Sequence, residues 1–439
     1  MSSGKRTLVA VAAAGLAMFA CSFGPNQQQP LPYGKDIVVG IPLSFTGNLS
    51  QESGMAKQGY DLWLDWVNGK QGGITVNGVR HRVRVLYEDD QSNALLAGGL
   101  AEKMITSEKA QFLLGPYGAS NTATVAAVAE AHHVPLISAN GSARSIFSKG
   151  YKYVFGVQTP ADRNLQAVFD MAASMNPKPA TVAMLSASDA FSQEVAKGAT
   201  DYAPMKGFKI VFNQQYPSGS TNLFNLLNQA KAAKPDIVVN SGHLLEALAL
   251  NKAAKDLRFQ AKMFVYSVGP TMPDFTKTLG RDANYVFTGS QWTGQVTYAP
   301  QYYVTVPQYV AAYRKKFHTQ DEPNYQVADG TAAGIALQRS IENAKSLQAD
   351  KVRNALRRLD MMTFYGRIKF DSVGQNPYKP MFVEQIQSLK RQTVWPSEMA
   401  NTAAQYPTPD WSVRSGVSAV VANPPAATLP KTGMPIGGG

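Results

Sequence analysis

Most of this sequence alternates short apolar runs with amphipathic runs, and that alternation limits the fold more than any other feature. The run IVVGIPL at residues 37–43 has the length of a buried strand, and residues 53–68 place apolar side chains at helical spacing. QFLLG (111–115), a helical run at 121–132 and VPLIS (134–138) continue the pattern. Strands that alternate with helices predict a mainly parallel sheet with helices on both faces.

A second series of the same kind begins near residue 156, so a chain of 439 residues is expected to form more than one core. Strand-like and helix-like runs alternate again as far as residue 267. Three helical segments follow at 307–317, 326–344 and 349–359, and two strand-like pieces at 367–371 and 381–387. We therefore predict an α/β protein with two wound sheets, in which the chain returns to each lobe near its end.

The two ends of the chain differ in composition from this body. Basic residues precede an apolar run at 8–20 that is too short to span a bilayer, so residues 1–21 are typical of a signal peptide. The run ends at Cys21, the single cysteine, where we expect lipid attachment, with a plain cleaved signal as the alternative. Residues 22–35 are typical of a linker, and 399–439 of a disordered extension. The mature protein is expected in the periplasm or at the cell surface.

Composition and motifs argue against catalytic and nucleic-acid functions. The formal net charge is +12, but the basic residues are spread along the chain, so no nucleic-acid surface is predicted. There is no GxGxxG, P-loop, GxSxG or HExxH motif, and the five histidines are scattered, so we expect no catalytic residue, metal site or cofactor. The acidic residues Glu88, Asp89 and Asp90 follow a strand, where capping of the next helix explains them best.

Three stretches, in order, resemble the periplasmic ligand-binding proteins of ABC importers, in their leucine/isoleucine/valine-binding (type I) class. They are GIPLSFTGNLSQESGMAKQGYDLWLDWVNGKQGGITVNG at residues 40–78, VRVLYEDDQSN at 83–93 and LLGPYGASNTATVAAVAEAHHVPLISANGSA at 113–143. The similarity extends from about residue 36 to 394. It implies a non-enzymatic α/β protein whose two Rossmann-like lobes, joined by three crossovers, close on a small ligand between them.

The resemblance also implies domain boundaries and partners. Lobe one is expected at residues 36–157 and 287–375, and lobe two at 158–286 and 376–398. In this class the closed, loaded form docks on a membrane permease driven by an ATPase, and the binding protein is a monomer. The same clamshell could instead report its ligand to a receptor as a sensor, and a secreted hydrolase is the remaining alternative.

The ligand-binding residues that the resemblance implies fall on turns at strand ends. Ligands of wound sheets bind beyond the carboxyl ends of the strands, where the small-residue turns GPYGASN and SANGSA lie, and the helix N–H groups there suit a carboxylate. On the first lobe the implied residues are Tyr117, Gly118, Ala119, Ser120, Asn140, Gly141 and Ser142. On the second lobe they are Phe191, as an aromatic lid, with His243 and Val268.

Two departures from the family pattern bear on the ligand. Ala119 stands where amino-acid-binding members place a serine, with Ser120 one residue later. Val268 stands where they place the carboxylate that pairs with the ligand's ammonium group. Because a buried ammonium without a partner is unfavourable, we expect a small carboxylate or amide rather than a standard amino acid, unless Asp189 or Glu246 replaces the missing acid.

Overall fold

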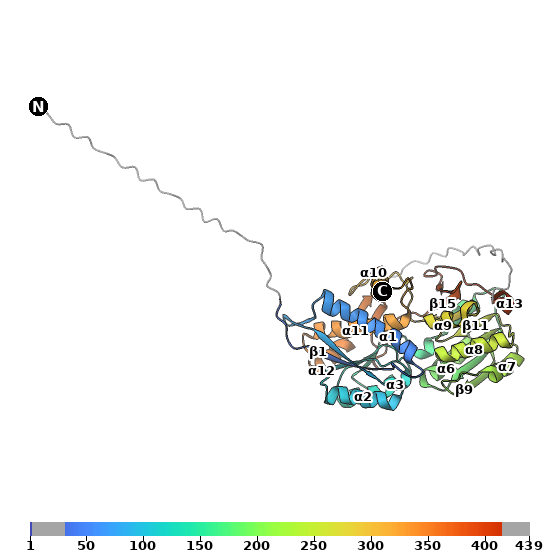
Figure 1. Cartoon of the computed structure of the whole chain (residues 1–439), viewed down its shortest axis with the longest axis horizontal. Coiled ribbons are helices and arrows are strands. Elements are labelled where there is room, and N and C mark those ends of the chain that lie inside the picture. The colour runs from blue at the N-terminus through green and yellow to red at the C-terminus, as the bar shows by residue number, and fades with distance from the viewer. Residues whose placement is uncertain (2–30, 415–439) are drawn as a thin grey trace.

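The computed structural model describes Met1 and residues 31–414, and in this part the chain forms two α/β lobes that lie side by side (Figure 1). The first lobe is built on five parallel strands in the order β4-β1-β5-β6-β7. These are β1 (Ile37–Leu43), β4 (Val83–Asp89), β5 (Phe112–Leu114), β6 (Leu136–Ser138) and β7 (Val154–Gly156). Its helices are α1 (Ser50–Leu64), α2 (Ala94–Thr106), α3 (Ala119–Ala131), α4 (Arg144–Phe147), α10 (Val306–Phe317), α11 (Tyr325–Ala344) and α12 (Ala349–Arg357).

The second lobe is built on seven strands in the order β16-β15-β12-β11-β10-β8-β9. They are β8 (Thr181–Ala187), β9 (Lys209–Tyr216), β10 (Ile237–Ser241), β11 (Met263–Tyr266), β12 (Val286–Ser290), β15 (Phe382–Gln387) and β16 (Lys390–Trp395). Strands β8 to β12 are parallel, whereas β15 is antiparallel to both of its neighbours. The helices here are α5 (Gln166–Ala173), α6 (Ala190–Met205), α7 (Phe224–Ala232), α8 (Leu244–Asp256), α9 (Pro273–Leu279) and α13 (Trp411–Arg414).

The predicted α/β class with parallel sheets is confirmed. The run IVVGIPL forms β1 itself, and Val39, Ile41 and Leu43 on it are fully buried. Strands of a parallel sheet are covered on both faces, so they appear in the sequence as continuous apolar runs rather than as alternating ones. Short elements complete the fold: the hairpins β2 (Ile74–Val76) with β3 (Val79–His81) and β13 (Asp360–Thr363) with β14 (Gly366–Lys369), a π-helical turn at Asp65–Lys70, and 3-10 turns at Ala161–Arg163 and Gly280–Ala283.

Helices α1 and α11 pack unusually closely, and small residues allow the approach. A Cβ atom at Gly59 of α1 would lie 2.0 Å from the carbonyl oxygen of Val327, and one at Gly330 of α11 would lie 2.4 Å from that of Ala56. Only glycine fits such positions. Helices α1 and α11 both begin at the end of the first lobe that faces the second lobe. Their close packing therefore holds both N-termini at that end.

The chain passes between the sheets three times, after β7, after β12 and before β15. The expected return to lobe one at residue 287 is wrong, because β12 pairs with β11 and β15 in the second sheet. Phe287 is fully buried in the core of that sheet. The second passage therefore follows Ser290.

The expected disordered extension is wrong for residues 399–414, which pack on the second lobe. The indole N–H of Trp411 donates to the carbonyl of Phe259 at 2.8 Å, and the side-chain amide of Gln385 donates to the carbonyl of Gln405 at 2.9 Å. The remainder of the extension, the signal peptide and Cys21 lie outside the described residues.

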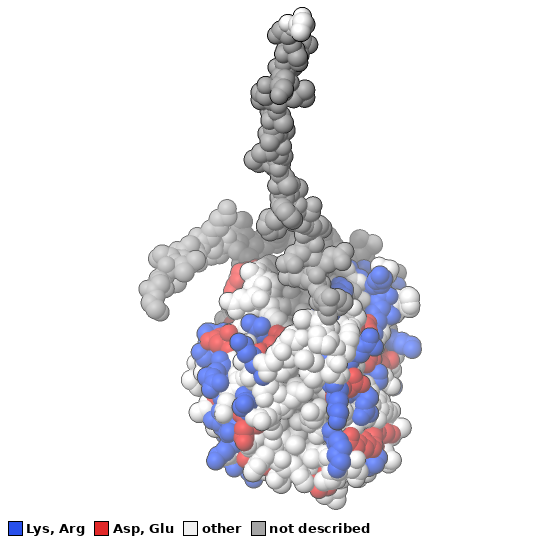
Figure 2. All heavy atoms as spheres, turned by 90° about the vertical axis from the view of Figure 1, so that its left-hand side faces the viewer, with Lys and Arg blue, Asp and Glu red and all other residues white. Residues whose placement is uncertain are grey.

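The charged residues of the described part are interspersed rather than gathered. Figure 2 shows basic and acidic side chains mixed around a largely uncharged centre on one end of the molecule. Within residues 31–414, no helix combines the length and the apolar character needed to cross a membrane.

Candidate functional site

The two small-residue turns of the first lobe lie side by side at the carboxyl ends of β5 and β6. Tyr117 and Asn140 form an isolated parallel bridge, and the N–H of Gly118 donates to the carbonyl of Asn140 at 3.3 Å. Gly118 has a φ of 85° and starts α3 with no side-chain cap, so the first N–H groups of that helix face the turn. A Cβ atom at Gly141 would lie 2.2 Å from the hydroxyl oxygen of Thr122, so this turn needs its glycine.

The facing turns of the second lobe start α6 and α8. Asp189 caps α6, because its carboxylate accepts the N–H of Ser192 at 3.0 Å. His243 is the N-cap residue of α8, and Glu246 accepts the backbone N–H of His243 at 3.1 Å. Phe191, in the first turn of α6, lies with its ring centroid 5.6 Å from that of His243.

Side chains from both lobes meet at these turns. The carboxylate of Glu52, in the first turn of α1, accepts the N–H of Leu244 at 3.0 Å, so the first lobe contributes a cap to helix α8 of the second. The rings of Tyr117 and His243 are 6.3 Å apart in an edge-on arrangement. We call the following set the junction cluster: Glu52, Tyr117, Asp189, Phe191 and His243.

His243 carries the positive charge of the junction cluster. Its Nε2 lies 3.5 Å from a carboxylate oxygen of Asp189, and its Nδ1 lies 4.0 Å from one of Glu52. Burial disfavours a charged histidine, but these carboxylates outweigh it and raise the pKa of His243 to about 9. Burial also disfavours the ionised form of Asp189, yet His243 and the bonds from Ser192 hold the pKa of Asp189 well below its usual range. Burial raises the pKa of Glu52, which His243 only partly offsets.

Several buried polar atoms at this junction have no hydrogen-bond partner among the described residues. They are Oε2 of Glu52, Oδ2 of Asp189, Oδ1 of Asn140, Oγ of Ser142, Oγ of Ser192, Nδ2 of Asn240 and Nδ1 of His243. An unsatisfied buried group costs roughly 1–3 kcal/mol, so native proteins contain few of them. Their concentration where two sets of strand ends face each other is the property expected of a site that bonds a small polar molecule.

The structure brings together part of the predicted site. Tyr117, Asn140, Phe191 and His243 converge as described above. Ser120 instead lies exposed on the first turn of α3, beside buried Ala119.

Val268 is buried in the apolar core, and it offers no polar group to the junction. The turn that carries it is still adjacent, because the hydroxyl of Ser267 bonds the backbone of Gly242. The roles of all these residues toward a ligand stay predictions.

Glu52 and Ser192 were missed by reasoning from the sequence. Both lie in the first turn of a helix that follows a strand, and that position is a usable signal in a wound fold. Neither lies in the two turns with small residues, which drew attention because glycine and hydroxyl residues replace bulky ones there.

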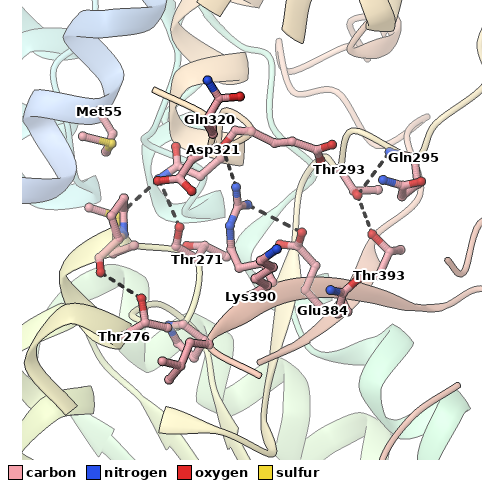
Figure 3. A pocket seen from close by; sticks show the side chains of 18 of the residues that line it. Met55, Thr271, Thr276, Thr293, Gln295, Gln320, Asp321, Glu384, Lys390 and Thr393 are labelled. Atoms are coloured by element: carbon pink, nitrogen blue, oxygen red, sulfur yellow. Dashed lines mark hydrogen bonds and ion pairs between the residues drawn. The ribbon is translucent and has the colours of Figure 1, made fainter. Parts of the chain in front are cut away.

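A cavity of about 710 Å³ also lies between the lobes (Figure 3). Met55 of α1, Tyr313 of α10 and Asn324 line it from the first lobe, and Thr271 and Glu384 from the second. None of the predicted ligand-binding residues lines this cavity. It therefore marks a second, open part of the boundary between the lobes.

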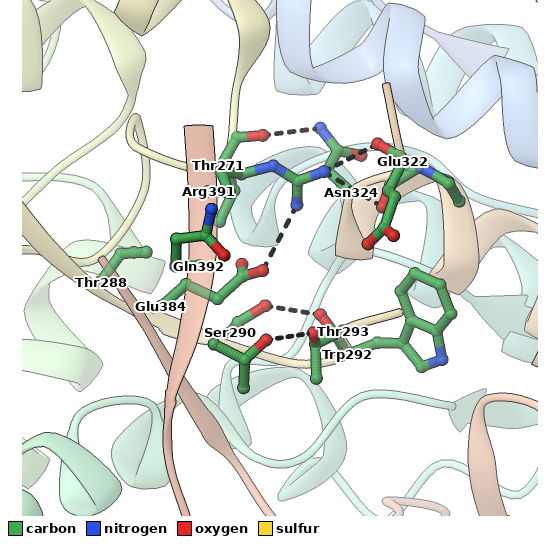
Figure 4. Close-up of polar contacts among 12 residues, drawn as sticks. Thr271, Thr288, Ser290, Trp292, Thr293, Glu322, Asn324, Glu384, Arg391 and Gln392 are labelled. Atoms are coloured by element: carbon green, nitrogen blue, oxygen red, sulfur yellow. Dashed lines mark hydrogen bonds and ion pairs between the residues drawn. The ribbon is translucent and has the colours of Figure 1, made fainter. Parts of the chain in front are cut away.

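Polar contacts across this boundary centre on Arg391 of β16 (Figure 4). Its guanidinium donates to the carbonyl oxygens of Glu322 at 2.7 Å and Pro323 at 3.2 Å, which belong to the loop before α11. The same guanidinium lies 3.6 Å from the buried carboxylate of Glu384. Arg391 is thus satisfied by partners within the protein, whereas Oε2 of Glu384 in the cavity wall has no hydrogen-bond partner among the described residues.

With this geometry in place, comparison with known proteins is decisive for the family. The family model described as "Periplasmic binding protein" matches residues 36–392, which is most of the chain. The chain is a periplasmic binding protein. Its fold is that of the type I class, and its full-length relatives include Leu/Ile/Val-binding protein homologues. The resemblance identified from the sequence is confirmed.

Relatives of this periplasmic binding protein are distant in sequence but similar along their full length. The Leu/Ile/Val-binding protein homolog 7 of Brucella abortus is 22% identical over 89% of this chain and 99% of its own. The leucine-binding protein LivK of Thermotoga maritima is 19% identical, covers 81% of this chain and 97% of its own, and superimposes with a TM-score of 0.73. A solute-binding protein of Rhodopseudomonas palustris, solved with benzoate, is 16% identical with 82% and 95% coverage and a TM-score of 0.70.

Proposed function

We propose that this periplasmic binding protein is the solute-binding component of an ABC transporter, which captures a small polar ligand between its lobes and delivers it to a membrane permease. The observation that carries the proposal is the concentration of buried, unpartnered polar atoms at the junction cluster and on the neighbouring turns. Related proteins solved with isoleucine and with benzoate support a small solute, because both molecules are of a size that such a site encloses.

Ligand capture would follow from the way the lobes meet. Glu52 and the α3 turn belong to one lobe, whereas His243, Asp189 and Phe191 belong to the other. A molecule that bonds both sets favours the closed arrangement over an open one by its differential affinity. The permease would then distinguish the loaded form by the relative position of the lobes. Neither step requires a chemical reaction of the ligand.

Isothermal titration of the mature protein tests the proposal with leucine, isoleucine, benzoate, 4-hydroxybenzoate, urea and short amides. Small-angle X-ray scattering on the same samples measures closure. We expect at least one compound to bind and to reduce the radius of gyration. Binding without any change in the radius of gyration for every compound would contradict capture by lobe closure.

Two substitutions locate the site. Ser142→Ala and Phe191→Ala should weaken binding without a change in secondary structure, because Ser142 presents an unpartnered hydroxyl and Phe191, at the edge of a core cluster, packs on His243. The matched controls Ser107→Ala and Phe224→Ala alter exposed residues far from the junction and should bind as the parent does. Equal affinity in all four variants would place the ligand elsewhere.

We also propose that the chain is exported and held at the outer face of the membrane by a lipid on Cys21, with the chain from residue 22 as the spacer. The end of the linker expected at 22–35 belongs to the first lobe instead, because the backbone of Pro32 and Gly34 bonds that of Arg80. The family is extracytoplasmic, which supports export. Mass spectrometry of the mature protein from a bacterial host tests this proposal. A diacylglycerol adduct on an N-terminal Cys21 supports it, and an unmodified N-terminus beyond that residue contradicts it.

A further inference from the structure

The buried polar atoms without partners at the lobe junction are mostly hydrogen-bond acceptors. Glu52 and Asp189 each present one unpartnered carboxylate oxygen, and Asn140 presents one amide oxygen. The hydroxyls of Ser142 and Ser192 can act either way, and the donors in this set are Nδ2 of Asn240 and Nδ1 of the charged His243. Acceptors of this kind are satisfied by N–H or O–H groups of a partner molecule.

Acidic side chains also outnumber basic ones at the junction. His243 is the cation that faces both Glu52 and Asp189, and within the described residues neither carboxylate forms an ion pair with a lysine or arginine. One imidazolium therefore faces two acids: it holds the pKa of Asp189 low, whereas burial raises the pKa of Glu52 and His243 offsets only part of that rise. Glu246 adds no free acceptor, because its two oxygens accept the backbone N–H groups of Gly219 and His243.

An anionic ligand group would be unfavourable next to this pair of acids. To bind there, it would have to displace water from the two buried acids, and only one positive charge lies nearby. Burial of unpaired like charges is strongly disfavoured. A cationic nitrogen would favour the ionised form of the buried Glu52 and supply donors to the unpartnered oxygens of both acids, since an ammonium group carries three N–H donors and no acceptor.

We propose that the ligand presents a positively charged nitrogen to Glu52 and Asp189. This inference rests on the proposed function and specifies the chemical class of its ligand. It takes up the alternative in which Asp189 replaces the acid missing at Val268, and it adds Glu52. The acids come from α1 of the first lobe and from the N-cap of α6, and not from the turn after β11. Since the two acids belong to different lobes, the nitrogen is also the group that would draw the lobes together.

Matched pairs of compounds test the charge requirement. Isothermal titration at pH 7 compares benzylamine with benzoate, and 3-methylbutylamine with 3-methylbutanoate, because the members of each pair share a carbon skeleton. We expect each amine to bind at least roughly 10-fold more tightly than its acid, as expected for one charge-assisted bond gained or lost. Tighter binding of the acids, or no measurable binding of either amine, overturns the inference.

Charge-neutral variants test the two residues. Glu52→Gln and Asp189→Asn keep an oxygen that can accept the N–H of Leu244 or Ser192, so both should fold, which circular dichroism confirms. Each should weaken amine binding by roughly 10-fold or more. The matched control Glu102→Gln neutralises an exposed carboxylate on α2 and should leave amine binding unchanged. Unchanged amine binding in both junction variants overturns the assignment.

Scattering separates this inference from the proposed function. If benzoate binds more tightly than benzylamine and compacts the protein, the ligand class is wrong and the transport role stands. If benzylamine binds through Glu52 and Asp189 without compaction, recognition of the nitrogen is supported and the capture mechanism fails.

Discussion

The ammonium group of Lys379 donates a hydrogen bond of 3.0 Å to the side-chain oxygen of Gln291, and so joins the third passage between the lobes to the second. The same oxygen accepts the N–H of Thr159 at 3.0 Å, and the side-chain nitrogen of Gln291 donates to the carbonyl of Thr159 at 3.0 Å. All three passages therefore meet at one buried glutamine. A hinge held in this way can bend only as a unit.

Substitution of Gln291 should destabilise the whole protein. In Gln291→Ala, the buried N–H and C=O of Thr159 lose their partners and Lys379 keeps only its bond to the backbone carbonyl of residue 291, which we expect to lower the free energy of unfolding by about 2–4 kcal/mol. Urea unfolding followed by circular dichroism measures the change. Gln295→Ala, a half-buried position four residues further along, is the control and should change stability by less than about 0.5 kcal/mol. Similar losses in both variants would contradict the role of Gln291.

Stability should depend on pH through His243. Its pKa is about 9 in the folded protein, against 6.5 for an ordinary histidine, so the folded state binds more protons between these values. The stabilisation is fully present below pH 6.5 and is lost as the pH rises through 9. The unfolding free energy of the parent should exceed that of His243→Gln. We expect this difference to decrease by about 3 kcal/mol over this pH range. Thermal unfolding of both proteins from pH 6 to 9.5 measures the difference. A constant difference would show that His243 is not charged at the junction.

The packing of α1 against α11 should not tolerate a methyl group. Gly330→Ala would place a Cβ atom 2.4 Å from the carbonyl oxygen of Ala56, and the resulting helix displacement should cost about 1–3 kcal/mol or more. Gly99→Ala on α2 is the matched control, because no atom lies within 4 Å of its Cβ position. This control should gain about 0.5–1 kcal/mol from helix propensity. Urea titration measures the change in unfolding free energy of both variants. A loss in Gly330→Ala with a gain in Gly99→Ala supports the packing argument, and equal changes refute it.

A second contact between the lobes should influence their closure. Glu194 of α6 accepts the N–H of Ser145 at 2.9 Å and also that of Arg144, so the second lobe caps α4 of the first. Glu52 caps α8 in the reverse direction, and the two contacts are reciprocal. Glu194→Ala should shift the ligand-free protein toward a larger radius of gyration in X-ray scattering, because the closed arrangement loses two hydrogen bonds. The control Glu102→Ala should scatter as the parent does, and an unchanged Glu194→Ala would show that this contact does not favour closure.

Periodicity in the sequence was sufficient for most of the long strands and helices and for the small-residue turns at the junction, but not for β13, β16, α9 and α13. The predicted strand at 37–43 and the apolar run at 181–187 are β1 and β8, because strand-forming side chains are selected by burial on both faces of a parallel sheet. The boundary after β12 was not predictable in the same way. Phe287 is apolar in either lobe, and only its pairing with Val265 and Gln385 shows which sheet it joins.

The sequence by itself determined the α/β class, the two wound sheets and the small-residue turns at Tyr117 and Asn140, since each follows from local spacing and from the shape of glycine. Only the tertiary structure decided that Glu52 meets Leu244 and His243. Glu52 and Leu244 are 192 positions apart and belong to different lobes, so their contact depends on how three passages orient one sheet against the other. The sequence shows that a carboxylate lies in the first turn of a helix, but it does not show which helix of the other lobe that carboxylate caps.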